Sequence, residues 1–236
     1  MNAALESLNS TIDQERATGA AILARAVGRW PKGTTAALAH RFEHDSSPRV
    51  RATALAALTR RAPMARAQWV WNQALDDADA AVRLRAVQLA PLIDRRSLAT
   101  PARPKRDEPS IVTALVRCTS DVDDLVAEGA CFALGEVELS HDIASAVNCL
   151  ADIVEHNEEP LVREAAVAAL GSIGDERGRD AILLACNDKP AVRRRAVLAL
   201  AAFEGADVDA AIKRALTDVD WQVRQAAEDL SDVPNE

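Results

Sequence analysis

The sequence predicts an all-α protein that is built from repeated pairs of helices. Of its 236 residues 49 are alanine, whereas aromatic residues make up only 3% and tyrosine is absent. Alanine has the highest helix propensity, and its small side chain lets helices pack closely. A β-sandwich or barrel depends on β-branched and aromatic residues, so this composition argues against both. No apolar run reaches the roughly 18 residues that a membrane-spanning helix needs.

One sequence phrase recurs six times, and this repeat is the main signal in the chain. Its valine returns after 32, 44, 36, 30 and 31 residues, at Val50, Val82, Val126, Val162, Val192 and Val223. A repeat of this length holds two helices and two turns, and it cannot bury its apolar face without neighbouring repeats.

Each phrase is interpreted as the start of the second helix of a pair, called here the B helix. An Asp or Asn precedes a tight turn, and Pro48, Pro160 and Pro190 stand at the first helical position, where a missing N–H costs nothing. Apolar residues then follow at helical spacing. The first helices of the pairs, called A helices, are expected at 34–44, 66–76, 110–119, 142–156, 177–186 and 207–217, after an N-terminal helix near 11–29.

The recurring element D-x-x-P-x-V-R-x-x-A-x-x-A-L resembles the HEAT repeat family, in particular the short HEAT-like repeats that are also found in phycobilisome lyases. The resemblance covers about residues 34–232. It implies an α-α superhelix, a HEAT-like solenoid of about six helix pairs plus the N-terminal helix, which forms a single solenoid over residues 1–236. In this family the B helices line the concave face, and the repeats serve many functions.

A polar pair recurs at the turn before each B helix. An Asp or Asn stands six residues before an Arg in five of the six phrases, and the resemblance implies that such pairs form a ladder between repeats. A buried guanidinium needs acceptors, and a carboxylate or amide at the turn supplies them. We therefore expect a structural role for Asp45, Arg51, Asp77, Arg83, Asn157, Arg163, Asn187, Arg193, Asp218 and Arg224. Ala127 interrupts the ladder in the third phrase.

The interval of 44 residues contains an insertion that departs from the repeat. Residues 94–110 contain three prolines and the basic residues Arg95, Arg96, Arg103, Lys105 and Arg106. Prolines and charges oppose regular structure, so the segment is predicted to be a basic loop. Two interpretations stay open, a solvated connection between repeats and a basic arm that docks an acidic partner.

The charge is distributed unevenly along the chain. The net charge is −8, but residues 1–118 carry 18 basic and 11 acidic residues, whereas residues 119–236 carry 10 basic and 25 acidic residues. The C-terminal half should repel phosphate backbones and would suit a basic protein segment, while the N-terminal half could hold an acidic surface. Alternatively, these charges only keep an alanine-rich stack in solution.

The second and sixth residues after each repeated valine are expected to face the concave groove. Apolar residues at these positions, with a charged rim, are typical of a protein-binding groove. The predicted partner-binding residues are Leu84, Gln88, Glu128, Phe132, Glu164, Arg194, Leu198 and Gln225. The alternative is that tight curvature buries the apolar side chains between helices. Trp221, which replaces the proline of other phrases, is expected to cap the stack or to anchor a partner.

Candidate chemistry is sparse. His40 and His44 belong to an H-x-x-E-H pattern and lie one helical turn apart, but a metal site would need a third ligand and a cleft for water. No phosphate-binding glycine loop and no nucleophile elbow occurs. We therefore expect no catalytic residues, no cofactor and no metal. The four cysteines lack CxxC spacing and the first residues lack a signal-peptide pattern, which predicts reduced thiols and a cytoplasmic location.

The function that these features favour is a non-catalytic scaffold or adaptor that binds a protein or peptide along the concave face. One alternative is a nucleic-acid-binding protein similar to the HEAT-like DNA glycosylases, which would need a basic groove with aromatic side chains. Another is an accessory subunit of a bilin-lyase-like system. Nucleic acid is the less favoured partner, no membrane partner is expected, and the oligomeric state stays open.

Overall fold

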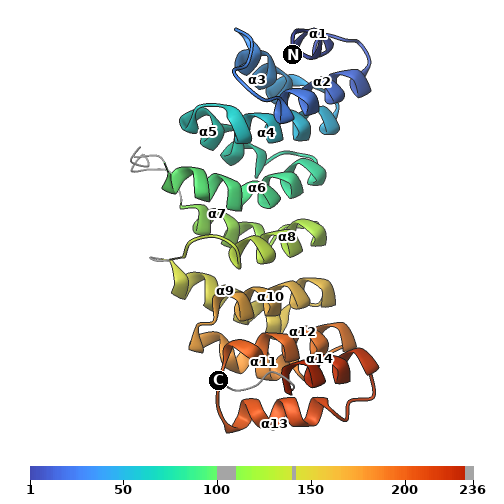
Figure 1. Ribbon diagram of the computed structural model, residues 1–236, viewed down its shortest axis with the longest axis vertical. Coiled ribbons are helices and arrows are strands. Elements are labelled where there is room, and N and C mark those ends of the chain that lie inside the picture. Colours follow the sequence, from blue (N-terminus) through green and yellow to red (C-terminus); the bar gives the residue numbers. More distant parts are fainter. Residues whose placement is uncertain (100–109, 140–141, 232–236) are drawn as a thin grey trace. The chain divides into compact units, whose positions relative to one another are not determined.

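The computed structural model describes residues 1–99, 110–139 and 142–231, and within these ranges helices are the only regular secondary structure (Figure 1). The all-α prediction is therefore confirmed over the described residues. The chain divides into two compact units, Met1–Ile111 and Val112–Glu236, called here the N-terminal and C-terminal units. The expectation of a single solenoid over residues 1–236 stays a prediction.

The N-terminal unit consists of consecutive helix pairs. Its A helices are α1 (Asn2–Ser7), α3 (Thr34–His44) and α5 (Met64–Ala74), and its B helices are α2 (Asp13–Arg25), α4 (Pro48–Arg61) and α6 (Ala80–Leu98). Within the unit the B helices stack in chain order, because α4 packs against both α2 and α6. Leu38, Leu55 and Leu58 are fully buried between the helices and form part of the core.

The C-terminal unit repeats the same alternation. Its A helices are α7 (Ile111–Cys118), α9 (Ile143–His156), α11 (Arg179–Ala185) and α13 (Ala206–Ala215), and its B helices are α8 (Asp124–Leu134), α10 (Pro160–Ile173), α12 (Pro190–Ala199) and α14 (Trp221–Ser231). Short 3-10 turns, Glu176–Gly178 and Leu200–Ala202, precede α11 and follow α12. Helix α10 packs between α8 and α12, and α12 also packs against α14.

The B helices begin where the repeated phrase predicts. Pro48, Pro160 and Pro190 are each the first residue of a helix, where proline loses no hydrogen bond. Where proline is absent, an aspartate takes over the start of the helix. Asp79 accepts a hydrogen bond from the Ala81 amide at 2.9 Å, which satisfies one of the free N–H groups at the N-terminus of α6.

The N-terminal helix expected near residues 11–29 is present as α2, although it is shorter, Asp13–Arg25. Helix α2 lies within this range, and a further helix, α1, precedes it, so the described residues contain one more helix pair than the repeated phrase indicates. Helix α2 is a B helix, because it stacks on α4 and carries Arg16 at the position that Arg51 holds in α4. Its role as a B helix was not predicted, because Glu15 replaces the repeated valine and no proline precedes it.

The predicted basic loop at 94–110 is wrong for its first residues. Helix α6 continues to Leu98 in spite of an internal proline at residue 91. Arg95 is an exposed helical residue, and Arg96 donates to the backbone oxygens of Thr59 and Ala62 at the end of α4. Those bonds satisfy carbonyls that the C-terminus of α4 leaves free, and this stabilises the extension of α6. Arg103, Lys105 and Arg106 lie outside the described residues.

An arginine ladder joins consecutive repeats within each unit. Arg51 donates from Nη2 to Asp77 Oδ1 at 2.7 Å and from Nε to Asp77 Oδ2 at 2.9 Å, so it binds the carboxylate of the next repeat bidentately. Its Nη1 donates backward to the Asp45 backbone oxygen at 3.0 Å. Arg16 binds the Asp45 carboxylate in the same way, at 2.7 and 2.8 Å. One guanidinium therefore joins two turns.

The C-terminal unit contains the same arrangement in two successive steps. Arg163 binds Asp188 at 2.6 and 2.7 Å and donates to the Asn157 backbone oxygen at 2.7 Å. Arg193 binds Asp218 at 2.9 and 2.6 Å and donates to the Asp188 backbone oxygen at 2.8 Å.

The other predicted ladder residues take different positions. Asn187 is wrong as the acceptor, because the turn is one residue shorter there and places Asp188 opposite Arg163; the exposed Asn187 side chain donates only to the Leu184 backbone oxygen at 3.4 Å. The Asn157 side chain accepts from the Glu159 amide at 2.9 Å. Arg83 and Arg224 donate to the backbone oxygens of Asp77 and Asp218, at 2.9 and 2.8 Å.

The ladder holds its carboxylates in the ionised form. Burial alone would raise the pKa of Asp45 and Asp77, but hydrogen bonds from Arg16 and Arg51 and from backbone amides outweigh it, and each pKa lies below its usual value. For Asp188 and Asp218 the hydrogen bonds from Arg163 and Arg193 are the main cause, and they also lower the pKa. These interactions therefore stabilise the fold only while the carboxylates are charged.

We expect Arg163→Ala to lower the free energy of unfolding by about 1–2 kcal/mol, because it leaves the Asp188 carboxylate without its bidentate partner. The matched control is Arg177→Ala. Arg177 also binds a carboxylate bidentately, that of Asp175 at 2.7 Å, but this pair is local and the Arg177 side chain is 44% exposed. Urea unfolding followed by circular dichroism should show a clearly smaller loss for the control, and equal losses would contradict the ladder's role.

The ladder also predicts the pH dependence of stability. Because the folded-state pKa of Asp218 lies below the unfolded value of about 3.9, its contribution is complete above that pH and is lost as the pH falls through the folded-state pKa. The difference in unfolding free energy between the wild type and Asp218→Asn should stay constant from neutral pH to about pH 5 and shrink below about pH 4. A difference that persists undiminished to about pH 2 would contradict this, and Glu155→Gln controls for the lost charge.

Candidate binding surface

The predicted binding residues all lie on the B helices. Leu84, Glu128, Glu164, Arg194 and Leu198 are half-buried, whereas Gln88 and Gln225 are exposed and Phe132 is 40% exposed. They are divided between the two units. Leu84 and Gln88 belong to the N-terminal unit and the others to the C-terminal unit, so each unit presents its own B-helix surface.

Phe132 is the main apolar feature of the B-helix surface in the C-terminal unit. It is an exposed phenylalanine on α8, a helix whose residues Ala130, Cys131 and Ala133 are buried. Leu198 on α12 is more covered, because it packs against the buried cluster that contains Val197 and Ala227. The interpretation that curvature buries the apolar positions therefore describes Leu198 better than Phe132.

Two carboxylates lie on neighbouring B helices of this surface. Burial and the negative charge of Glu164 raise the pKa of Glu128 above its usual value. Glu164 lies 3.4 Å from Arg195 Nη2, while the described residues provide no cationic partner for Glu128. The surface therefore carries a partly buried negative charge that a cation from another molecule could neutralise.

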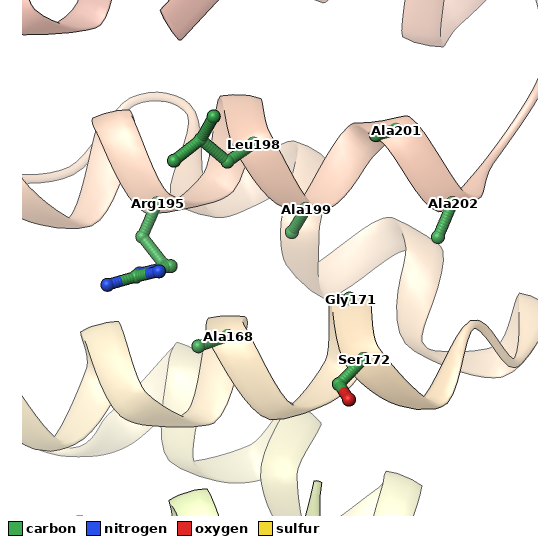
Figure 2. A pocket seen from close by; sticks show the side chains of 8 residues that line it. All are labelled: Ala168, Gly171, Ser172, Arg195, Leu198, Ala199, Ala201 and Ala202. Atoms are coloured by element: carbon green, nitrogen blue, oxygen red, sulfur yellow. The ribbon is translucent and has the colours of Figure 1, made fainter.

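A hollow of about 350 Å³ lies between parts of α10 and α12, next to Arg195 of this ion pair (Figure 2). Ala168, Gly171 and Ser172 line it from α10, and Arg195 and Leu198 line it from α12. The helices lie close together at Gly171, where a Cβ atom would lie 2.6 Å from Ala199 Cβ. Arg195 was not predicted, although its place two residues after the ladder arginine could have indicated it.

A second hollow, of about 470 Å³, lies on the B-helix surface of the N-terminal unit. Residues of α2, α4 and α6 line it, including the predicted Leu84 and Gln88. Three arginines, Arg25, Arg60 and Arg85, also line it, and they are not among the predicted partner-binding residues. Small side chains from alanine residues make up most of the remaining wall.

The histidines and cysteines that were considered as candidates for metal binding or catalysis have ordinary packing contacts. The His40 and His44 rings meet edge to face with centroids 4.9 Å apart, and His44 Nε2 lies 3.7 Å from Glu43 Oε2. No group of three or more His, Cys, Asp or Glu side chains that could hold a metal occurs within the described ranges. Burial raises the pKa of Cys131 to about 12, which keeps this thiol protonated and unreactive.

Trp221 does not cap the stack. It is the first residue of α14, and its side chain is 63% exposed, outside the buried cluster of the last repeat. The cluster consists of Val197, Ala215, Val223, Ala226 and Ala227.

Of the two tryptophans on α5, Trp71 is fully buried and donates to the Ala86 backbone oxygen at 2.8 Å, whereas Trp69 is 39% exposed.

In the part of the chain that the structure describes, no helix combines the length and the apolar character that crossing a bilayer would require.

Comparison with known proteins places the chain among the helical repeat proteins. Residues 111–189 match the family model described as HEAT repeats. The structure of YibA from Escherichia coli is similar over 98% of this chain and 81% of its own, with 19% identity and a TM-score of 0.69. A mutant of Kap121p is similar over 96% of this chain and 28% of its own, with 16% identity and a TM-score of 0.63.

Designed repeat proteins are also similar to this chain. A computationally designed armadillo repeat protein for modular peptide recognition covers 97% of both chains, with 17% identity and a TM-score of 0.51. No curated protein sequence matches this chain. At these identities the similarity concerns the fold alone. The chain is therefore a helical repeat protein with the fold of the HEAT and armadillo solenoids, and its residues 111–189 carry HEAT repeats.

Proposed function

We propose that the protein is a non-catalytic scaffold or adaptor that binds protein segments on the surfaces of its B helices. The C-terminal unit would bind a basic segment with an apolar side chain. The observation that carries this proposal is the uncompensated charge of Glu128, half-buried beside Glu164 and four residues before the exposed Phe132. A lysine or arginine of the partner would neutralise the carboxylates, while Phe132 would pack against the apolar side chain.

The fold supports a binding role, because stacked repeats present an extended ordered surface. A designed protein with a similar fold was made for modular peptide recognition. The side chains considered above include no nucleophile paired with a base, and the buried Cys131 is unsuited to act as one.

Nucleic acid is the less favoured partner for this surface. Residues 119–236 carry a net charge of −15, which opposes the approach of a phosphate backbone. For the bilin-lyase-like alternative no structural feature adds support to the sequence resemblance. The four cysteines are free thiols in the structure, which agrees with the cytoplasmic location that we propose.

The proposal is tested by reversing both charges in Glu128→Lys/Glu164→Lys and measuring the binding of a short fluorescent peptide in which Lys alternates with Ala around a central Leu. We expect the affinity to fall at least about tenfold, because two attractive charge pairs become repulsive. Phe132→Ala should also weaken binding, but this loss of affinity should depend less on salt concentration than the loss caused by the charge reversals, because the lost contact is apolar.

The matched control is Glu155→Lys/Glu204→Lys, which changes the net charge equally at exposed positions outside the surface. It should bind almost as the wild type does. An equal loss in the control, or an affinity that the Glu128 and Glu164 substitutions leave unchanged, would exclude this surface as the binding site.

A further inference from the structure

The hollow of the N-terminal unit has a charge opposite to that of the C-terminal surface. Arg25, Arg60 and Arg85 line it from α2, α4 and α6, one from each B helix of the unit. The described residues that line the hollow include no carboxylate and no aromatic ring. Three cations thus share one cavity of about 470 Å³ without a negative group in its wall.

These arginines differ from the ladder arginines in their partners. Arg16 and Arg51 each bind an aspartate bidentately, whereas Arg60 donates from Nη1 to the Ala56 backbone oxygen of its own helix at 3.1 Å. Arg85 has only a long contact of 3.4 Å to Gln88 Oε1. Within the described chain, none of the three arginines of the hollow forms an ion pair.

Local helix stability explains only part of this arrangement. Arg25 and Arg60 lie in the last turns of α2 and α4, where a cation interacts favourably with the helix dipole. Arg85 lies in the second turn of α6, near its N-terminus, where the dipole gives a cation no benefit. Burial and the positive charge of Arg60 both lower the pKa of Arg85, so its position costs stability within the free protein.

We propose that this hollow is a second binding site, which takes an acidic peptide segment through its aspartate or glutamate side chains. The guanidinium groups present forked pairs of donors that match carboxylates bidentately. The alanine side chains leave room for a peptide backbone, and the Gln88 amide can hydrogen-bond it. The Thr53 hydroxyl donates to the Arg49 backbone oxygen at 2.7 Å, which leaves its oxygen to accept from a peptide N–H. Leu84 offers an apolar contact between the charged groups.

The same features favour a peptide over nucleic acid. Single-stranded nucleic acid binds through aromatic side chains that stack on its bases, and the described lining of the hollow has none. This site deepens the proposed scaffold function, on which it rests, because the protein would then join a basic segment and an acidic segment through separate surfaces.

The experiment measures binding of a short fluorescent peptide in which Glu alternates with Ala to the full chain. The probes for comparison are the same peptide with Gln in place of Glu and a labelled single-stranded oligonucleotide. We expect the Glu peptide to bind with an affinity that falls as salt is added, and the Gln peptide to bind at least about tenfold more weakly.

The decisive variant is Arg25→Ala/Arg60→Ala/Arg85→Ala, which should weaken binding of the Glu peptide at least about tenfold. The matched control is Arg29→Ala/Lys32→Ala/Arg95→Ala, which removes the same charge from exposed positions outside the hollow and should weaken it less than about threefold. Arg60→Lys/Arg85→Lys keeps the charge but removes the paired N–H donors of the guanidinium groups, so we expect an intermediate loss of affinity.

Several outcomes would overturn the proposal. In the first, the folded wild type fails to bind the Glu peptide, and in the second, the decisive and control variants lose the same affinity. The third such outcome is that the oligonucleotide binds more tightly than the Glu peptide and that the decisive variant abolishes its binding. The basic peptide distinguishes the two sites, because its binding should not change in the arginine variants. If it binds while the Glu peptide does not, the proposed function stands and this inference fails. If neither peptide binds, both fail.

Discussion

The fold of each unit depends on one recurring interaction, the arginine that joins the turns of consecutive repeats. Arg51 and Arg163 each bind a carboxylate of the next repeat with two donors and a backbone oxygen of their own repeat with a third. A guanidinium at a repeat interface would be costly without acceptors, so these bonds both satisfy the charge and fix the spacing of neighbouring pairs. The apolar contacts between B helices then supply the burial that no single repeat could achieve.

The ladder also determines which charges remain for binding. An arginine with a carboxylate in the adjacent turn is occupied, and its partner is held ionised. Some charged residues on the open side of the B helices, such as Glu128 and Arg85, have no partner of opposite charge among the described residues. The same repeat frame therefore carries a negative surface in one unit and a positive hollow in the other, because the residues that form these surfaces are not those that form the ladder. This separation of charges supports the proposal that the protein joins segments of opposite charge.

Much of the fold could be predicted from the repeated phrase, and the failures have identifiable causes. The B helices begin at the expected residues because proline and aspartate act locally at helix starts. Helix α2 was predicted, but its role as a B helix paired with α1 was not, because Glu15 replaces the repeated valine. The end of α6 was misplaced because Arg96 satisfies carbonyls of α4, a contact between residues far apart in the sequence. Among the residues of the proposed binding surfaces, Leu84 and Phe132 were predicted from their spacing after the repeated valine. Arg25, Arg85 and Arg195 were not predicted.

The sequence by itself determined the helical class, the spacing of the helix pairs and the turn residues, because helix propensity, proline placement and apolar periodicity act over a few neighbouring residues. Only the tertiary structure decided which acceptor each arginine meets. Asp188 rather than Asn187 binds Arg163, since a difference of one residue in a turn changes which side chain faces the preceding helix. The hollow with its three unpaired arginines was decided in the same way, because charges from three helices become neighbours only when the helices stack.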